Sequence, residues 1–192
     1  MEYKTALSLI AIVIAFLSFI PYFRDIFAGR TKPHAFSWFV WAVITGSASA
    51  IQVAERGGVG AGVAGSTSLL CFVIFLLALF KGKRHFHIVD WVSFLAALVS
   101  LALWWLAKSP ISAIILLTLT DALGYIPTFR KGYSKPYEDT AATFGFNGLA
   151  FFISLFALET WKITTWLYPA SLVLTNGSFV TMLYIRRKQL KK

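Results

Sequence analysis

The sequence predicts an all-α transmembrane protein of seven helices, built as two three-helix repeats joined by one linker helix. Three observations lead to this fold class: an apolar composition, recurring apolar runs of membrane-spanning length, and two similar segments that each contain a proline. Hydrophobic residues make up 58% of the 192 residues and charged residues only 14%. A soluble domain carries about 25% charged residues, so we expect a multi-pass integral membrane protein.

Seven apolar runs approach the ~20 residues that an α-helix needs to cross the hydrocarbon core. Helices are expected because an open sheet edge in lipid would leave backbone groups unpaired. The first run is interpreted as a spanning helix and not as a signal peptide, since its basic cluster follows it and no small-residue cleavage site is present. The expected spans are Thr5–Phe23, Ala35–Val53, Gly62–Phe80, Ile88–Ala107, Ile111–Phe129, Thr140–Ala157 and Thr165–Ile185.

The distribution of Lys and Arg predicts the orientation of the chain. Of the 18 basic residues, 14 fall in the first, third and fifth loops and the C-terminal tail, and 4 fall in the other connections and the N-terminal tail. The positive-inside rule then places the N-terminus outside and the C-terminus in the cytoplasm, in a plasma membrane or a bacterial inner membrane. The net charge of +10 is attributed to lipid head groups and not to nucleic acid, because the basic residues lie between apolar runs.

Two segments of the chain resemble each other around Pro21 and Pro127. Each proline stands near the end of an apolar run and is followed by Phe-Arg and then by a Thr/Ser-Lys-Pro triplet. Aligning the prolines pairs the first three spans with the last three and leaves the fourth as a linker. The predicted division is 1–83 for the first repeat, 84–110 for the linker and 111–192 for the second repeat. An odd linker helix gives both repeats the same orientation, and transporters built this way bind at the repeat interface near the midplane.

Asp121 is the main candidate for chemistry because it lies in the middle of the fifth apolar run. An aspartate at that depth costs about 2.5–3.5 kcal/mol on insertion scales. Desolvation favours the neutral carboxyl, so we expect this group to gain and lose a proton near neutral pH. Its functional interpretation is a proton carrier or a partner for a cationic or hydroxyl-rich solute. The alternative is a structural aspartate that is neutral or hydrogen-bonded to its neighbours.

Polar residues at helical spacing suggest a cavity around this carboxyl. On the fifth span Thr118, Asp121, Tyr125 and Thr128 form one stripe, and on the sixth Thr140, Thr143 and Asn147 form another. On the seventh span Ser171, Thr175 and Ser178 lie on one side with Asn176 beside them. Asp121, Asn147 and Asn176 lie roughly 12, 11 and 14 Å from their cytoplasmic ends at about 1.5 Å per residue. The alternative for both asparagines is hydrogen bonding between helices.

The first repeat has no acid at the position that matches Asp121, but it offers an aromatic and hydroxyl face on the second span. Trp41 and Thr45 are candidates for solute contact, and Trp38 fits either this aromatic wall or a membrane-interface anchor. Pro21 and Pro127 each remove one helical hydrogen bond. They are interpreted as a pair of hinges that open and close the cytoplasmic side, with a static kink as the alternative.

Enzymatic activity is not expected, since the spans contain no nucleophile with its base and no metal cluster. The histidines, His34, His85 and His87, all fall in loops, and an H-x-H pair without further ligands rarely holds a metal. Cys71 is the only cysteine, so no internal disulfide can form. We expect no cofactor and no metal.

The arrangement resembles the PQ-loop and SWEET transporter superfamily. The matching residues are Pro21 with Phe23, Arg24 and Thr31-Lys32, and Pro127 with Phe129, Arg130 and Ser134-Lys135; Tyr22 and Thr128 replace the glutamine of the Pro-Gln pair. The resemblance implies seven helices as three plus one plus three, an outside N-terminus, and prolines that act as hinges for alternating access. Asn176 matches the asparagine that sugar-carrying members use in the last helix of a triplet.

The function expected from these features is transport of a small polar solute across the bilayer by alternating access, driven by the solute gradient or by protons through Asp121. A second hypothesis is a membrane receptor or scaffold on the same fold, without transport. The candidate contact residues are Asp121, Asn147, Asn176, Tyr125, Thr118, Trp41 and Thr45. The expected partners are this solute, protons under the coupled alternative, and the lipid bilayer, and an oligomer is compatible with the sequence.

Overall fold

The computed structural model describes residues 2–29, 33, 35–81, 88, 91, 92, 95, 98, 99, 102, 106, 109–137 and 139–190. Most of the predicted span Ile88–Ala107, the pair Thr31-Lys32 and the three histidines lie outside these residues. All regular structure in the described part is helical, as expected. The elements are α1 (Glu2–Phe27), α2 (Ala35–Ala54), the 3₁₀ helix η1 (Gly58–Gly60), α3 (Ala61–Lys81), α5 (Pro110–Ser134), α6 (Ala141–Ala157) and α7 (Ile163–Leu190).

Several helices are longer than the apolar runs that predict them. The sequence placed Arg130 and Lys131 in a loop, and this was wrong: α5 continues to Ser134. Cations are favourable at the C-terminal end of a helix, where its dipole is negative. The helix ends just before Lys135, which precedes Pro136, and a residue before proline is pushed out of the helical region. The apolar run therefore predicted the apolar part of α5 and not its end.

Three described helical segments are long and apolar enough to cross a membrane: Glu2–Phe27, Gly58–Lys81 and Pro110–Ser134. Trp38–Ala54 and Ala141–Ala157 are shorter apolar helices. α7 is not in either group, because its length includes many polar residues. α1 also carries large apolar side chains that are more than half exposed, among them Leu9, Val13 and Ile20. Such a surface is unfavourable in water, and these features are compatible with a membrane protein.

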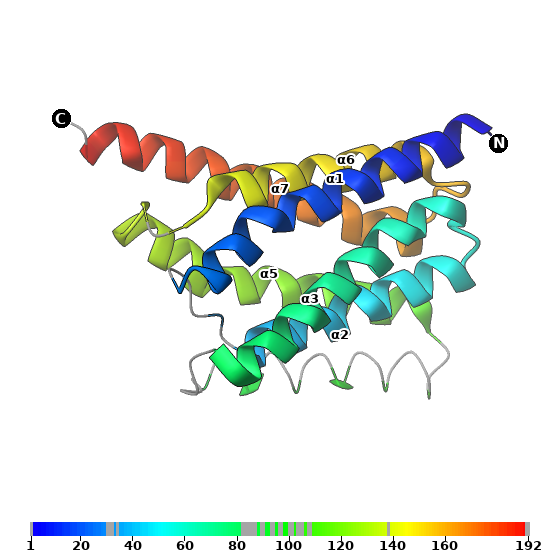
Figure 1. The fold of residues 1–192 in the computed structure, drawn as a ribbon. Helices are drawn as coiled ribbons and strands as arrows, with labels where there is room; N and C mark the ends of the chain where they lie inside the picture. The colour runs from blue at the N-terminus through cyan, green and yellow to red at the C-terminus, as the bar shows by residue number, and fades with distance from the viewer. Residues whose placement is uncertain are drawn as a thin grey trace.

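Following their order in the chain, we call α1–α3 the first triplet and α5–α7 the second triplet. In the first, α3 packs against both α1 and α2; in the second, α7 packs against both α5 and α6. Between the triplets, α1 packs along α6 and α2 approaches α5. Figure 1 shows the helices side by side along one long direction, with the N- and C-termini at opposite ends. The packing order is thus the same in the two triplets.

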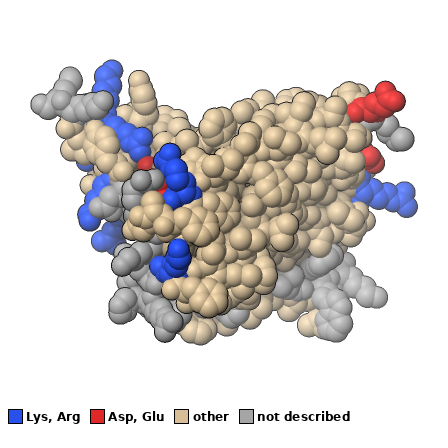
Figure 2. All heavy atoms as spheres, in the orientation of Figure 1, with Lys and Arg blue, Asp and Glu red and all other residues tan. Residues whose placement is uncertain are grey.

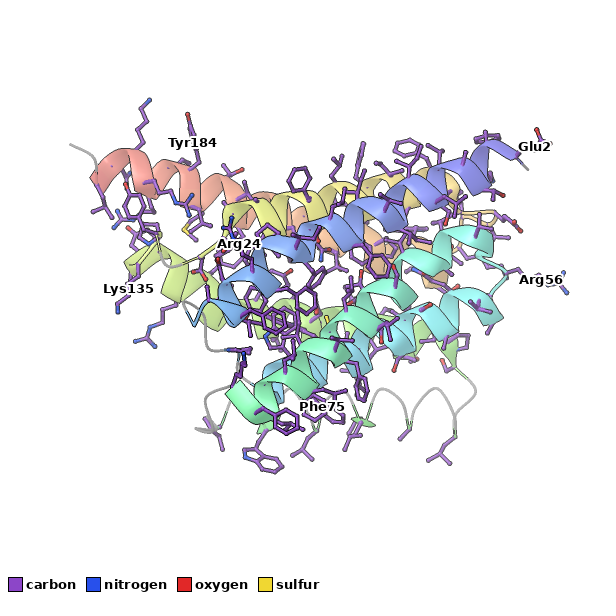
Figure 3. All side chains as sticks on the ribbon, viewed as in Figure 1. Glu2, Arg24, Arg56, Phe75, Lys135 and Tyr184 are labelled. Carbon is purple, nitrogen blue, oxygen red and sulfur yellow. The ribbon has the colours of Figure 1, made fainter. Side chains whose placement is uncertain are left out.

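Charged side chains gather at the two ends of the bundle. In Figure 2 most visible Lys and Arg side chains lie at one end, over the ends of α5 and α7. Figure 3 places Arg24 and Lys135 at this end, and Glu2 and Arg56 at the other. We call these the Lys135 end and the Arg56 end. The described basic residues in the last turns of helices at the Lys135 end are Arg24, Lys81, Arg187 and Lys188.

The Arg56 end is held by a close backbone contact at Gly60. A Cβ at this position would lie 3.0 Å from the backbone of Ala157 and Leu158. We expect Gly60→Ala to destabilise the protein by about 1–3 kcal/mol, because a backbone neighbour has to shift. Gly177→Ala is the matched control, since a Cβ there meets nothing within 4 Å and alanine favours a helix. Thermal unfolding in detergent should show a lower midpoint for the first variant only; equal midpoints would contradict the packing.

Candidate functional site

A cavity of about 280 Å³ lies between the two triplets, and all six described α-helices contribute to its wall. The first triplet supplies mainly aromatic and small side chains, and the second supplies most of the polar ones. It reaches Asp139 and Thr140, in the segment between α5 and α6, and so extends toward the Lys135 end. The other wall residues are Phe19, Tyr22, Trp38, Trp41, Thr45, Thr67, Cys71, Asp121, Tyr125, Thr128, Thr143, Phe144, Asn147, Phe151, Tyr168, Leu172 and Asn176.

Asp121 projects from α5 into this cavity and is only 2% exposed. Its Oδ2 atom is buried and has no hydrogen-bond partner in the described structure. Leaving a buried polar atom unpaired costs about 1–3 kcal/mol, and more for a charged group. The carboxyl therefore faces a space in which water or a solute completes its hydrogen bonding.

Further buried polar atoms of the cavity wall also have no hydrogen-bond partner among the described residues. They belong to Thr67, Thr143, Asn147 and Tyr168. Native proteins leave few buried polar atoms unpaired, so their concentration around one cavity is informative. These atoms can hydrogen-bond to water or to a solute that supplies donors and acceptors.

Two neighbouring polar groups on the second triplet are already paired. The Tyr125 hydroxyl donates to Asn176 Oδ1 at 3.2 Å, and Asn176 Nδ2 donates to the Leu172 carbonyl at 2.7 Å. A Cβ on Gly148 would lie 3.1 Å from Asn176 Cβ, so glycine lets α6 approach α7 there. These contacts fix Tyr125 and Asn176 as rigid parts of the wall.

An aromatic cluster forms the opposite wall. Trp38 Nε1 donates to the Tyr22 hydroxyl at 3.2 Å. The rings of Trp38 and Trp41 have centroids 5.2 Å apart, and those of Trp41 and Tyr125 6.2 Å. Trp41 therefore connects the first triplet to α5 beside the cavity. Trp38, which the sequence left open between wall and membrane anchor, is 8% exposed and lines the cavity.

The structure brings six of the seven predicted contact residues to this cavity: Asp121, Asn147, Asn176, Tyr125, Trp41 and Thr45. Thr118 is not in the wall. Its hydroxyl donates to the Ile114 carbonyl at 2.7 Å, within its own helix. Helical Ser and Thr hydroxyls often donate to a backbone carbonyl of their own helix. Helical spacing alone therefore assigned one residue too many to the cavity-facing side of α5.

The face of α7 was also assigned differently from the sequence. Ser171 and Thr175 donate back to carbonyls of α7, while Tyr168, Leu172 and Asn176 line the cavity. These three residues follow one another at intervals of four, which is the signal that could have identified the face. The predicted face of α7 was chosen for its polar residues and not for this spacing. It therefore left out Tyr168, which is fully buried.

Hydrogen bonds between the triplets close the Arg56 end. Gln52 Nε2 donates to the Thr165 carbonyl at 2.9 Å, and the Glu159 N–H donates to the Gly57 carbonyl at 3.0 Å. The Glu55 carboxylate pairs with Lys162 Nζ at 3.1 Å. We call these contacts the Arg56-end closure. They join the end of α2 and the segment after it to the first turn of α7 and the segment before it.

At the Lys135 end the described hydrogen bonds of Arg187 stay within the second triplet. Its guanidinium donates to the Pro136 carbonyl at 2.8 and 2.9 Å and to the Asp139 carbonyl at 2.7 Å. The Tyr137 hydroxyl donates to the Arg187 carbonyl at 3.1 Å. Arg187 thus fixes the α5–α6 segment at the mouth of the cavity without tying it to the first triplet.

Pro21 lies inside α1, and α5 continues through Pro127. Neither helix ends at its proline, so both keep a position where one backbone hydrogen bond is missing. Whether these positions act as hinges stays a prediction.

In comparisons with known proteins, no family model matches the chain, and no curated protein or solved structure matches it. The cavity and its residues are therefore the basis on which a function is proposed.

Proposed function

We propose that the protein is a multi-pass membrane transporter that moves a small polar solute by alternating access. The observation that carries this proposal is the cavity between the triplets, which holds a buried carboxyl with an unpaired oxygen. A site at the interface of two similar triplets is the usual arrangement in transporters built from repeats. The resemblance to the PQ-loop and SWEET superfamily points the same way, and the equal packing order of the triplets supports it.

In this proposal the Lys135 end is cytoplasmic and the Arg56 end is outside, in keeping with the concentration of basic residues. The Arg56-end closure then blocks the outer side, while the cavity extends toward the cytoplasmic side. In the proposed cycle this arrangement is the inward-facing conformation. Transport requires the closure to break and the Lys135 end to come together.

The test is solute flux by the purified protein in liposomes, with protein-free liposomes as the baseline. A panel of organic cations, zwitterionic amino acids and sugars covers the main classes of small polar solute. Flux above the baseline for at least one class supports the proposal. Binding without flux across the panel would favour the receptor or scaffold hypothesis.

Pro127→Ala tests the hinge. Alanine restores an N–H that can donate to the Leu123 carbonyl, which stiffens α5. We expect several-fold slower turnover in proteoliposomes with unchanged solute affinity. Pro110→Ala is the control, because Pro110 begins α5 and a proline at the first helical position costs no hydrogen bond. Wild-type turnover in Pro127→Ala would indicate a static kink.

A further inference from the structure

We infer that the solute is a monovalent organic cation, a protonated amine or a guanidinium without a carboxylate of its own, and that it exchanges with a proton at Asp121. This inference rests on the proposed transport function. It names the chemical class that the cavity is built to take.

The charge of the cavity wall gives the first reason. Asp121 and Asp139 are acidic, and no Lys, Arg or His is among the described residues of the wall. The remaining titratable groups that face the cavity are Tyr22 on α1, Cys71 on α3, Tyr125 on α5 and Tyr168 on α7. α2 contributes Trp38, Trp41 and Thr45, which do not titrate. An anionic solute would therefore find no described cation to pair with, whereas a cation finds a carboxylate.

The unpaired atoms give the second reason. Asp121 Oδ2 and Asn147 Oδ1 are buried acceptors without donors in the described structure. An ammonium group carries three N–H donors and a guanidinium five. Hydrogen bonds from a charged donor to a carboxylate are about twice as strong as neutral ones. The donors of an organic cation thus match acceptors that the described wall leaves open.

The aromatic cluster gives the third reason. A Cβ on Gly124, one turn from Asp121 on α5, would lie 3.8 Å from Trp41 Nε1. The indole of Trp41 is therefore packed against α5 close to the carboxyl. Tryptophan is the best aromatic partner for a cation, and the attraction increases when water is excluded. A cation held by Asp121 can also contact the rings of Trp41 and Tyr125.

The same geometry disfavours amino acids. A zwitterion brings a carboxylate that needs its own cation or a set of donors, and burying it unpaired is costly. Tyr125 and Asn176 already use their hydroxyl and amide groups on each other and on the Leu172 carbonyl. The hydroxyls of Thr67, Thr143 and Tyr168 remain as neutral donors, but the described wall offers a carboxylate group no cation to pair with.

Exchange follows from Asp121, the carboxyl that a helix contributes to the wall, whereas Asp139 lies in the segment between α5 and α6. When the cation enters, the Asp121 carboxyl releases its proton to water and the carboxylate pairs with the cation. When the cation leaves, a proton takes its place. No covalent bond of the solute changes, and Asp121 with its occupant is neutral in both states. Since the carboxylate is the binding form, cation affinity should fall as the pH is lowered.

Binding to the purified full-length protein in detergent tests the inference with three probes of similar size. Benzylguanidinium is a cation, benzylurea is its neutral isostere, and phenylalanine is a zwitterion. We expect only benzylguanidinium to raise the thermal unfolding midpoint, with less effect at lower pH. Asp121→Asn should weaken its binding on the order of 10- to 100-fold, because the ion pair with a carboxylate is replaced by a hydrogen bond to a neutral amide. Asp25→Asn is the control, because Asp25 pairs with Arg24 outside the cavity.

Equal binding of benzylurea and benzylguanidinium, or wild-type affinity in Asp121→Asn, would overturn the inference. If Asp121→Asn does not fold, Asp121→Glu keeps the carboxylate, and the wild-type comparison of the two isosteres still decides. The proposed function can fail separately. Benzylguanidinium that binds but never crosses the liposome membrane would refute transport and leave the cation site intact. Flux of a neutral solute without any cation binding would refute the cation site and leave transport intact.

Discussion

Replacing Asp121 by Asn is expected to abolish the acceleration of solute flux by a pH gradient. In the wild-type protein a proton gradient should drive uptake, because the carboxyl carries a proton in one direction and the solute in the other. Asparagine has nearly the same size but cannot titrate. Asp121 is 2% exposed. Because the two side chains are nearly equal in size, the substitution at this buried position removes the exchangeable proton without opening a large cavity. The flux that remains in the variant should be slow and independent of pH.

The measurement is solute uptake into proteoliposomes with and without an imposed pH gradient. Asp25→Asn provides the matched control, because it removes a carboxylate near the Lys135 end and outside the cavity wall. Elution as a single species and a retained unfolding transition show that the Asp121 variant is folded. Unchanged pH dependence in folded Asp121→Asn would count against proton coupling.

Locking the Arg56-end closure is expected to stop transport completely. A Cβ built on Gly58 would meet Cγ and Cδ of Glu159, so the sulfur atoms of cysteines introduced at both positions lie within reach of a disulfide. The bond joins the segment after α2 to the segment before α7 and prevents the outer side from opening. In the double variant, Gly58→Cys with Glu159→Cys, oxidation should reduce flux to the level of protein-free liposomes, and a reductant should restore it.

The single variants are the controls for this experiment. Gly58 has a φ of +69°, which costs a residue with a side chain roughly 1–2 kcal/mol; the Gly58→Cys variant alone reports this strain. Both single variants should transport equally with oxidant and with reductant. Benzylguanidinium should still bind to the oxidised double variant, because the cavity reaches the Lys135 end. Undiminished flux in protein shown by mass spectrometry to be cross-linked would contradict alternating access at this end.

The helices themselves could be predicted from the sequence, and the reason is physical. An apolar run of membrane-spanning length has few alternatives to a helix in lipid, so six predicted spans appear as described helices. Their ends were less predictable, since basic residues such as Arg130 are compatible with either a loop or the last turn of a helix. An apolar run predicts the part of a helix that can lie in lipid. Capping residues and prolines determine the residue at which the helix ends.

The cavity could be predicted in part. Asp121, Asn147 and Asn176 were expected to share one space from their similar depths, and the structure places all three in its wall. Depth along a helix follows from counting residues, whereas rotation about the axis depends on packing. For this reason the sequence predicted the wrong side of α7 to face the cavity, and it counted Thr118 among the cavity residues.

The contacts that close or clamp the ends could not be read from the sequence. Arg187 binds the carbonyls of Pro136 and Asp139, and Gln52 binds the carbonyl of Thr165. A backbone carbonyl is present at every residue, so no residue type marks these partners. Only the approach of distant segments in the folded chain defines them.

The most direct test of the account is to count protons and cations together in proteoliposomes that contain the wild-type protein. Benzylguanidinium uptake and the opposing movement of protons are followed in the same sample, with the membrane potential set to different values. We predict that one proton leaves for each cation that enters, at a rate that does not depend on the potential. Cation uptake without any proton movement would contradict a site in which both compete for Asp121.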